Sequence, residues 1–334
     1  MCKSMSQKKN RPVMPGPRRR VLVWLALLLT LIEGANAMEL QGHRGARGVL
    51  PENSLPGFQH AIAEGMDCLE LDIAMTRDKQ IVVTHDPGLN PDITRKGKDW
   101  VSERTLIKSL AAADLKAFDI GGIKPGTDYA NRFPDQRSID GLRMPLLSEV
   151  FALPEVRSDA SLCLDIEIKT TPTDEDATFP PEEIAEALVA AIDKAGLRKR
   201  SRIRSFHWRG LVHVRKIAPD IPTAFLTAAR RWLNNLEKGL PGKSNWLAGL
   251  DIDDFGGSPP RAISHLGGAV WAPHWRDLTK EDLAQAQKLG LKVIVWTVNE
   301  EDDIRRMIEM GVDGITTDFP ARARRLADTL AKPR

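Results

Sequence analysis

Cysteine is scarce in this sequence: a chain of 334 residues contains three, at positions 2, 68 and 163. None of them stands at a spacing from another cysteine or a histidine that is typical of a zinc site, so such a site is not indicated. Cys68 and Cys163 lie in apolar, strand-like runs, where a free cysteine behaves as a small hydrophobic residue. We therefore expect two buried free thiols, although an exported protein permits a disulfide that spacing alone cannot reveal.

The sequence also has no apolar stretch of the length that a membrane-spanning helix normally requires. The apolar stretch 21–32 ("VLVWLALLLTLI") has 12 residues, whereas a spanning helix needs about 20. It follows a basic segment that closes with three arginines, and it is followed by small residues up to Ala37. This order is typical of a secretory signal peptide. We expect residues 1–37 to be cleaved off and 38–334 to be exported to the periplasm without a stable membrane span; the alternative is an uncleaved anchor.

An excess of positive charge is absent once the signal peptide is set aside. The full chain has a net charge of +3, but residues 1–37 contain seven lysines and arginines and one acid. The rest of the chain carries 41 basic and 44 acidic residues, a net charge of −3. A slightly acidic surface argues against nucleic acid as a partner, because nucleic-acid sites depend on clustered basic residues.

Beyond residue 37, short strand-like runs alternate with helical patterns. The patterns at 54–65, 181–195, 279–289 and 301–310 end at or next to a glycine, the residue that most often caps a helix C-terminus. Repeated alternation of strand and helix predicts a parallel sheet, and eight such units close into a barrel. The predicted fold is α/β, a (β/α)8 TIM barrel, with strands at 39–44, 68–75, 162–169, 202–206, 223–227, 269–273, 292–298 and 314–317.

A ninth strand-like run, 81–86, breaks this rhythm. Only "TRDKQ" separates it from the run before, which is too short for a crossover helix between parallel strands. We therefore predict an added antiparallel hairpin strand. A turn centred on Asp78 would place Asp72 nearly opposite His85.

Residues 88–145 differ from the rest of the chain, being rich in Gly, Pro and charged residues. We interpret them as an inserted subdomain. Because the insertion follows the strand that bears His85, it should lie over the barrel mouth, where long loops act as lids or substrate-binding segments. The sequence shows no internal repeats, and the basic tail after Pro320 is expected to form a solvated terminal helix.

Polar residues gather at the predicted carboxyl ends of four strands, the ends that face the active site of a barrel. Residues two apart in a strand point the same way, so Glu70 and Asp72 share one face. The complete set is His43 and Arg44, Glu70 and Asp72, His85 and Asp86, and Glu167 and Lys169.

Three of these residues, Glu70, Asp72 and Glu167, are acids that would repel one another in a barrel mouth. Burying an unpaired carboxylate costs several kcal/mol, so a cation between them is expected. All-oxygen ligands favour one hard divalent cation, calcium or magnesium, over zinc. The alternative is that Arg44 and Lys169 neutralise the acids without a metal.

Two histidines beside this cluster suit general acid–base catalysis, because the pKa of histidine lies near neutrality. A metal, an arginine and a lysine around one spot also favour an anionic substrate, most simply a phosphate. The residues alone thus indicate a metal-dependent enzyme that acts on an anionic substrate.

The segments "HRGARGVLPENSLPGF", "LELDIAMTRDKQIVVTHDP", "DIEIK" and "VIVWTVNE" occur in this order between His43 and Pro320. In combination they resemble the glycerophosphodiester phosphodiesterases, here in an exported form. The resemblance implies a phosphodiesterase-type TIM barrel with an inserted subdomain, hydrolysing glycerophosphodiesters (deacylated phospholipids) to glycerol 3-phosphate and an alcohol. In that family a hydroxyl of the substrate's glycerol attacks phosphorus, and water opens the resulting cyclic phosphate.

The resemblance also implies a role for each matching residue. Glu70, Asp72 and Glu167 match the metal ligands, and His43 and His85 match the catalytic acid–base pair. The residues expected to hold the phosphate are Arg44 and Lys169.

Several other positions keep two interpretations. Glu52, in the "PENS" element, either contacts the metal or a substrate hydroxyl, or is simply an acid that is favourable at a helix N-terminus. Trp296, at a strand end with Asn299 shortly after it, packs against the glycerol or leaving group or belongs to the barrel core. His207 and His274 also lie near strand ends and are kept in reserve.

Two other functions remain open at this stage. A lysophospholipid could replace the deacylated substrate if residues 88–145 accommodated an acyl chain, although the insertion has few large apolar residues, mainly Trp100, Phe118 and Phe133. A binding protein on a degenerate barrel would have lost site residues, and this sequence retains them. The leaving-group alcohol is not determined by the sequence.

Overall fold

The computed structural model describes Met1 and residues 38–240 and 242–331. The predicted signal peptide, apart from Met1, lies outside these residues. Among the described residues, no helix is both long and apolar enough to cross a membrane.

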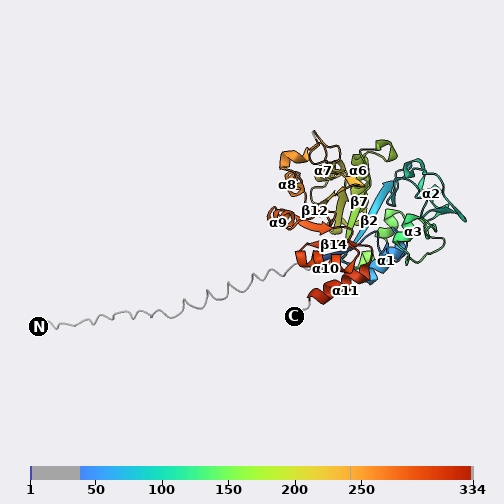
Figure 1. The fold of residues 1–334 in the computed structure, drawn as a ribbon, viewed down its shortest axis with the longest axis horizontal. Helices are drawn as coiled ribbons and strands as arrows, with labels where there is room; N and C mark the ends of the chain where they lie inside the picture. The colour runs from blue at the N-terminus through green and yellow to red at the C-terminus, as the bar shows by residue number, and fades with distance from the viewer. Residues whose placement is uncertain (2–37, 241, 332–334) are drawn as a thin grey trace. The chain divides into compact units, whose positions relative to one another are not determined.

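Eight parallel strands form a closed barrel, as the sequence predicts (Figure 1). The first strand, β1, pairs with both the last strand, β14, and with β2, and these pairings close the barrel. The strands are β1 (Glu39–Gly42), β2 (Cys68–Met75), β7 (Cys163–Ile168), β8 (Ser201–Ser205), β9 (Thr223–Thr227), β12 (Val270–Pro273), β13 (Lys292–Val295) and β14 (Gly314–Thr317).

Helices surround the barrel, and their ends follow the capping residues in the sequence. The Ser54 hydroxyl accepts a hydrogen bond from the Gly57 amide at the start of α1, while Gly196 and Gly311 adopt left-handed conformations directly after α6 and α10. The helices of this layer are α1 (Leu55–Ala63), α6 (Pro181–Ala195), α7 (Trp208–Ile217), α8 (Pro259–His265), α9 (Lys280–Lys288), α10 (Glu301–Met310) and α11 (Pro320–Ala331).

The terminal helix α11 corrects one prediction. It is not solvated on all sides, because Ala323 and Leu326 are buried against the rest of the barrel. The segment has apolar residues at helical spacing between its basic residues, and the prediction failed because it considered only the charge of the segment.

The predicted hairpin is present. Strand β3 (Ile81–Val83) runs antiparallel to β2 with Ile73 opposite Val83, and the Thr84 amide donates to the Asp72 carbonyl at 3.0 Å. Asp72 therefore lies opposite Thr84, one residue from His85. The hairpin brings the His85 side chain to the same end of the barrel as the acids of β2.

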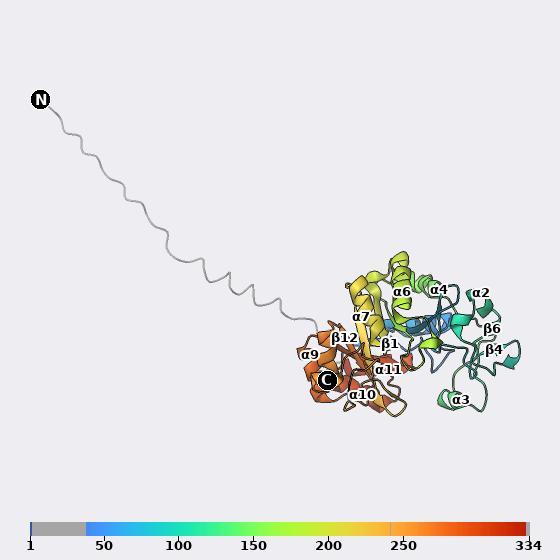
Figure 2. The ribbon, with the colours of Figure 1, turned by 90° about the horizontal axis from the view of Figure 1, so that it is seen from above.

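Residues 88–145 form a small layer with a core of its own. Three two-residue strands, β4 (Arg95–Lys96), β5 (Asp99–Trp100) and β6 (Phe118–Asp119), make a sheet in the order β5-β4-β6. Leu89, Ile107 and Ile120 pack with Val82 of β3 beneath it. In both views the insertion lies on the side of the barrel opposite α9 (Figures 1 and 2).

Short elements complete the described fold. The insertion also holds η1 (Ile107–Ser109), α2 (Ala112–Leu115) and α3 (Asp128–Arg132), and the chain returns to the barrel through α4 (Leu147–Phe151) and α5 (Pro154–Ser158). The remaining ones are η2 (Glu175–Ala177), η3 (Arg198–Arg200), the hairpin of β10 (Ala229–Arg230) and β11 (Leu233–Asn234), and η4 (Ile252–Phe255).

Side chains that alternate along the barrel strands separate into two kinds. Leu69, Leu71 and Ile73 of β2 belong to the apolar core, whereas the residues between them are buried acids. A second network of polar and charged side chains, which we call the lower layer, is centred nearer the amino ends of the strands and consists of Glu39, Gln41, Asp165, Arg202 and Arg204. Arg204 joins this network from a position next to Glu167 in the β7–β8 ladder.

The two cysteines are not free thiols. Cys68 and Cys163 form a disulfide between β2 and β7, and they are the first residue pair of that parallel ladder. Their Cα atoms lie 4.4 Å apart, at the lower end of the usual range for disulfides. The prediction of free thiols was wrong because 95 residues separate the cysteines in sequence, and only the closed barrel makes their strands neighbours.

Candidate active site

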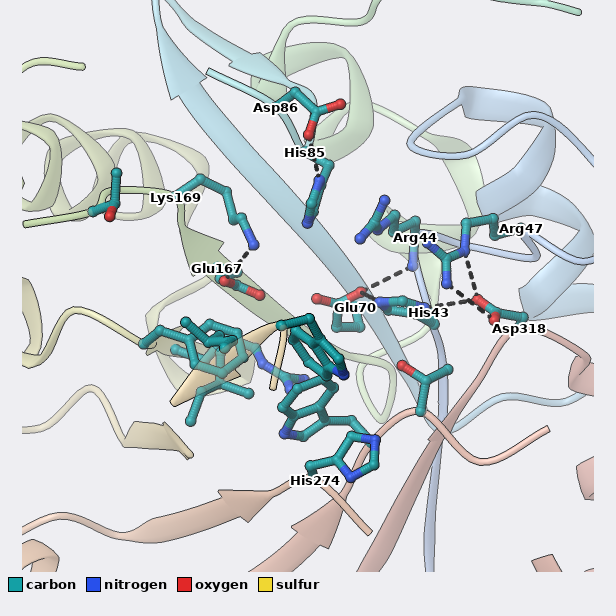
Figure 3. Close-up of a pocket in the computed structure, with 18 of the residues that line it drawn as sticks. His43, Arg44, Arg47, Glu70, His85, Asp86, Glu167, Lys169, His274 and Asp318 are labelled. Atoms are coloured by element: carbon teal, nitrogen blue, oxygen red, sulfur yellow. Dashed lines mark hydrogen bonds and ion pairs between the residues drawn. The ribbon is translucent and has the colours of Figure 1, made fainter. Parts of the chain in front are cut away.

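Three carboxylates meet at the carboxyl ends of β2 and β7. Each of Glu70, Asp72 and Glu167 offers an oxygen within 4.8 Å of the others, and all three residues are at most 5% exposed. Their strands place them there directly, because Asp72 and Glu167 are partners in the β2–β7 ladder and Glu70 points the same way as Asp72. Glu70 and Glu167 face each other across the cavity floor in Figure 3.

Two basic side chains reach these acids. Arg44 places its Nε 3.2 Å from Asp72 Oδ2, and Lys169 donates from its Nζ to Glu167 Oε1 at 2.8 Å. The Lys169 Nζ also lies 3.8 Å from Asp72 Oδ1. Together with the three acids, Arg44 and Lys169 form what we call the upper layer. The sequence left open that Arg44 and Lys169 neutralise the three acids without a metal, and the structure shows that they offset part of this charge.

The upper layer nevertheless contains three acids and only two bases. Burial and, after it, the charge of the neighbouring Asp72 together raise the pKa of Glu70 to about 8. Burial also opposes the charge on Asp72, but Arg44, His85 and Lys169 hold the pKa of that carboxyl well below its usual range. Three converging carboxylates with an all-oxygen donor set therefore fit a hard divalent cation, with Glu70, Asp72 and Glu167 as the residues that would hold it.

The backbone of the His-Arg-Gly motif is shaped for this contact. Arg44 adopts a left-handed φ of +50°, and its amide donates to Glu70 Oε2 at 2.9 Å. Gly45 follows with φ +85°, and a Cβ there would stand 2.7 Å from the carbonyl carbon of Gly57 in α1. The motif thus needs glycine so that Arg44 can direct both its amide and its side chain toward the acids of β2.

Glu52 lies beside Arg44 and outside the group of three acids. Arg44 donates from Nη1 to both Glu52 oxygens, at 2.9 and 3.0 Å, and the Tyr129 hydroxyl of the insertion donates to Glu52 Oε2. In this structure Glu52 therefore orients the guanidinium of Arg44. Tyr129 makes the insertion part of the cavity wall, and no motif or spacing in the sequence indicates this contribution.

His43 is oriented by an aspartate that the sequence analysis missed. Its Nδ1 lies 2.7 Å from Asp318 Oδ1, and Arg47 and Asn299 also donate to Asp318. Burial disfavours the charge on Asp318, but Arg47 and His43 hold the pKa of this carboxyl well below its usual range. Asp318 is therefore an acceptor, and the Nδ1 of His43 must carry the proton.

The other ring nitrogen of His43, Nε2, is available for proton transfer. Its Nε2 faces the carboxylates, 3.9 Å from Glu70 Oε2. Burial, and after it the charge of Arg47, lowers the pKa of His43 to about 3. The ring is thus neutral in this environment, with an unprotonated Nε2 that can accept a proton. Asp318 directly follows β14, so the strand-end rule that found the other site residues would also have found it.

His85 is arranged in the same way. Its Nδ1 lies 2.8 Å from Asp86 Oδ1, and the Asn90 amide donates to Asp86 Oδ2 at 2.6 Å. Burial opposes the charge on Asp86, but the hydrogen bond from His85 helps to lower the pKa of that carboxyl to about 2. Both histidines therefore direct Nε2 away from an aspartate. Figure 3 shows the His85 ring above Glu70 and the His43 ring beside it.

Both histidines, their aspartates, Glu70, Glu167, Arg44, Lys169 and Tyr129 line one cavity of about 820 Å³, whereas Asp72 and Glu52 do not reach its surface. Trp296 also lines it, with its indole nitrogen donating to the Ala272 carbonyl at 2.8 Å, and His274 lies at the far edge. His207 does not line this cavity, and its Nδ1 contacts the Thr170 hydroxyl at 3.1 Å. The cavity further includes Arg47, Arg132 and Arg204, which the sequence analysis did not single out.

Comparison with known proteins agrees with this geometry. Residues 43–322 match the glycerophosphoryl diester phosphodiesterase family. A glycerophosphodiester phosphodiesterase of Caldanaerobacter subterraneus is 31% identical over 278 residues, covering 83% of this chain and 93% of that protein. A crystal structure from Silicibacter pomeroyi, of a protein assigned as a glycerophosphoryl diester phosphodiesterase, superposes with a TM-score of 0.77 at 37% identity, covering 88% of this chain and 94% of that one.

A third comparison concerns a bound product. A phosphodiesterase of Oleispira antarctica, solved in complex with sn-glycerol-3-phosphate, shares the fold with a TM-score of 0.62 at 21% identity. The alignment covers 87% of this chain and 96% of that one. The family match extends over most of this chain and contains every site residue predicted from the sequence. The chain belongs to the glycerophosphoryl diester phosphodiesterase family.

Proposed function

We propose that this phosphodiesterase hydrolyses glycerophosphodiesters with one divalent cation and two histidines acting as acid and base, giving glycerol 3-phosphate and an alcohol. The observation that carries the proposal is a cluster of three buried carboxylates at one cavity, which is lined by two of them and by two histidines, each histidine oriented by its own aspartate. The Oleispira protein, crystallised with the same product, supports the choice of substrate.

Glu70, Asp72 and Glu167 would hold the cation. When bound, it would offset their charge and stabilise negative charge that develops on the phosphate oxygens. Calcium and magnesium both accept this oxygen donor set. Arg44 and Lys169 supply the fixed positive charge that binds and orients the phosphate beside the three acids.

The histidines move the protons. One Nε2 accepts the proton of the attacking glycerol hydroxyl, while the second histidine protonates the oxygen of the leaving alcohol. The resulting cyclic phosphate is opened by water, with the two roles exchanged. Asp318 and Asp86 keep each ring in the tautomer that this exchange needs. The nucleophile belongs to the substrate, so the protein needs only the proton-transfer pair and the charged groups around phosphorus.

We also propose that the enzyme acts outside the cytoplasmic membrane, in the periplasm. The Cys68–Cys163 disulfide supports this location, because disulfides persist mainly in oxidising compartments. N-terminal sequencing of the protein from a periplasmic extract should give a mature chain that begins at Met38. Recovery of the uncleaved chain from the membrane fraction would instead indicate an anchor.

The central experiment is an assay of glycerophosphocholine hydrolysis after treatment with a chelator. We expect activity to disappear and to return when magnesium or calcium is added, and the relative recovery would identify the cation. Full activity without metal would refute the metal-dependent mechanism. A parallel assay with lysophosphatidylcholine tests the alternative substrate class, and faster turnover of that lipid would replace the proposal.

A further inference from the structure

One wall of the active-site cavity is aromatic and is not used by the proposed chemistry. The ring centroids of Trp232, Trp296 and His274 lie 6.0, 5.9 and 5.3 Å apart in pairs, in edge-to-face contact. Trp232 stands in the turn of the β10–β11 hairpin and is 63% exposed although it lines the cavity. A large aromatic ring exposed at a cavity rim is typical of a surface that a ligand covers.

This wall is continuous with the groups that would hold the phosphate. The Lys169 Nζ lies 5.7 Å from the centre of the Phe206 ring, and that ring lies 5.1 Å from the ring of Trp296. Contacts therefore run from Lys169 through Phe206 and Trp296 to Trp232. Figure 3 shows His274 on the side of the cavity away from His85 and Asp86. A substrate with its phosphate at Lys169 can extend one substituent along this wall.

The cavity has room for such a substituent. Its volume of about 820 Å³ lies in the range of about 300–1,000 Å³ that encloses whole drug-sized ligands. A glycerol and a phosphate held at Arg44 and Lys169 occupy only part of it. The remaining volume, bounded by the aromatic wall, is available to the leaving alcohol.

The charges near the wall disfavour a cationic leaving group. The acids that line the cavity are Glu70, Asp86, Glu167 and Asp318, and among the described residues none of them comes from the β10–β11 hairpin or from β12. Asp277, close to the hairpin, is already paired with Arg230 at 3.1 Å and accepts from the Ala229 amide at 2.9 Å. The three rings touch one another, with centroids 5.3–6.0 Å apart, so no ammonium group fits between them as it would in an open aromatic cage.

His274 gives the wall a hydrogen-bond donor. Its Nδ1 accepts from the backbone amide of Arg276 at 3.3 Å. Because an amide can only donate, Nδ1 carries no proton, and the proton of the ring lies on Nε2. An aromatic wall with a donor at its edge matches an alcohol that has both an apolar C–H face and hydroxyl groups.

We propose that Trp232, Trp296 and His274 form the subsite for the leaving alcohol, and that it selects a neutral polyhydroxy alcohol, such as a cyclitol, over a quaternary ammonium alcohol. The inference rests on the proposed function, because it assumes that a glycerophosphodiester is bound with its phosphate at Arg44 and Lys169. Trp232 is then a specificity-determining residue, which stacks on the leaving group without touching the reacting atoms.

The test compares Trp232→Ala with the wild type on glycerophosphoinositol and glycerophosphocholine. Loss of one stacking contact should lower kcat/KM for the inositol diester about five- to tenfold, mainly through KM. The value for the choline diester should stay within about twofold. Trp232→Phe should restore most of the loss. Leu289→Ala, which removes an exposed apolar side chain from the far end of α9, is the matched control and should change neither substrate.

Equal losses for both substrates, a larger loss for the choline diester, or no loss at all would overturn the inference. A second variant, His274→Phe, keeps the aromatic ring but removes the donor, and it should lower kcat/KM for the inositol diester alone. If the wild type hydrolyses no glycerophosphodiester, the proposed function itself fails. If the wild type is active but neither variant discriminates between the substrates, only the leaving-group assignment fails.

Discussion

The barrel contains two layers of buried charge, one above the other, and they are organised differently. In the lower layer Arg202 donates to Glu39 at 2.6 Å and to Asp165 at 2.8 Å, and Arg204 and Gln41 also reach Asp165. Two acids therefore face two bases, and the charge of one of these bases, Arg204, also lowers the pKa of Glu70 in the upper layer. In the upper layer three acids face Arg44 and Lys169, and Arg44 is shared with Glu52.

The difference is visible in the protonation of the acids. Burial opposes the charge on Asp165, but Arg202 and Arg204 lower the pKa of this carboxyl. Burial and Asp72 raise the pKa of Glu70. Each layer has one fully buried carboxylate oxygen without a hydrogen-bond partner, Asp165 Oδ1 and Asp72 Oδ1, so these oxygens alone do not separate the layers. The ratio of acids to bases does separate them, and it indicates that the upper layer is the one built to receive a cation.

The sharpest test of this comparison is removal of one charge from the upper layer. Glu70→Gln should lower kcat by about 100-fold or more, because it removes a cation ligand from the reacting centre. The folded state should be retained, since the variant also removes a repulsion among three acids. Steady-state kinetics and thermal unfolding measure both effects. Wild-type activity in the variant would show that the upper layer does not serve catalysis.

The matching change in the lower layer should affect stability. Arg202→Met leaves Glu39 and Asp165 without their shared partner, and breaking a buried ion pair costs about 3–5 kcal/mol of unfolding free energy. Urea denaturation measures this loss. The kcat of the folded variant should remain near the wild-type value. A loss of activity without a loss of stability would contradict the division between the layers.

Added cation should stabilise the protein through the upper layer alone. At about 100 times the dissociation constant, magnesium or calcium should raise the unfolding free energy by about 2.7 kcal/mol, because the ion binds the folded state. Thermal unfolding with and without the ion measures this. The increase should vanish in Glu70→Gln and persist in the less stable Arg202→Met. An equal increase in Glu70→Gln would place the ion elsewhere.

The smallest expected effect is the pH dependence of the lower layer. The folded-state pKa of Asp165 lies below its ordinary value of 3.8, so its charge stabilises the folded state above that pH. This stabilisation is lost as the pH falls below about 3.8 and through the lowered pKa. Asp165→Asn should therefore be less stable than the wild type at pH 7 by about 1–3 kcal/mol, with a smaller difference in acid. A constant difference across pH would contradict this.

The sequence predicts the upper layer and the barrel better than it predicts the lower layer. The eight strands follow from the alternation of apolar runs and helical patterns, and the upper acids stand out because they interrupt an apolar strand. Arg202 and Arg204 alternate with Ile203 in the same way, but strand alternation alone cannot show that their common face is the barrel interior. The strand-end rule also covers Asp318, although its pairing with His43, 275 residues away, is visible only in the closed fold. The contact of Tyr129 with Glu52, 77 residues apart, follows no such rule, so only the fold reveals it.

The disulfide between Cys68 and Cys163 has a consequence for ion size. It ties together β2 and β7, the strands that also bear all three of the converging carboxylates. Two strands joined covalently at one end of their ladder cannot slide past each other to change the gap between Asp72 and Glu167. Because Mg²⁺–oxygen bonds are about 2.0–2.1 Å long and Ca²⁺–oxygen bonds about 2.3–2.6 Å, a gap of fixed width favours one ion radius over the other. Reduction of the disulfide should therefore weaken discrimination between the two ions.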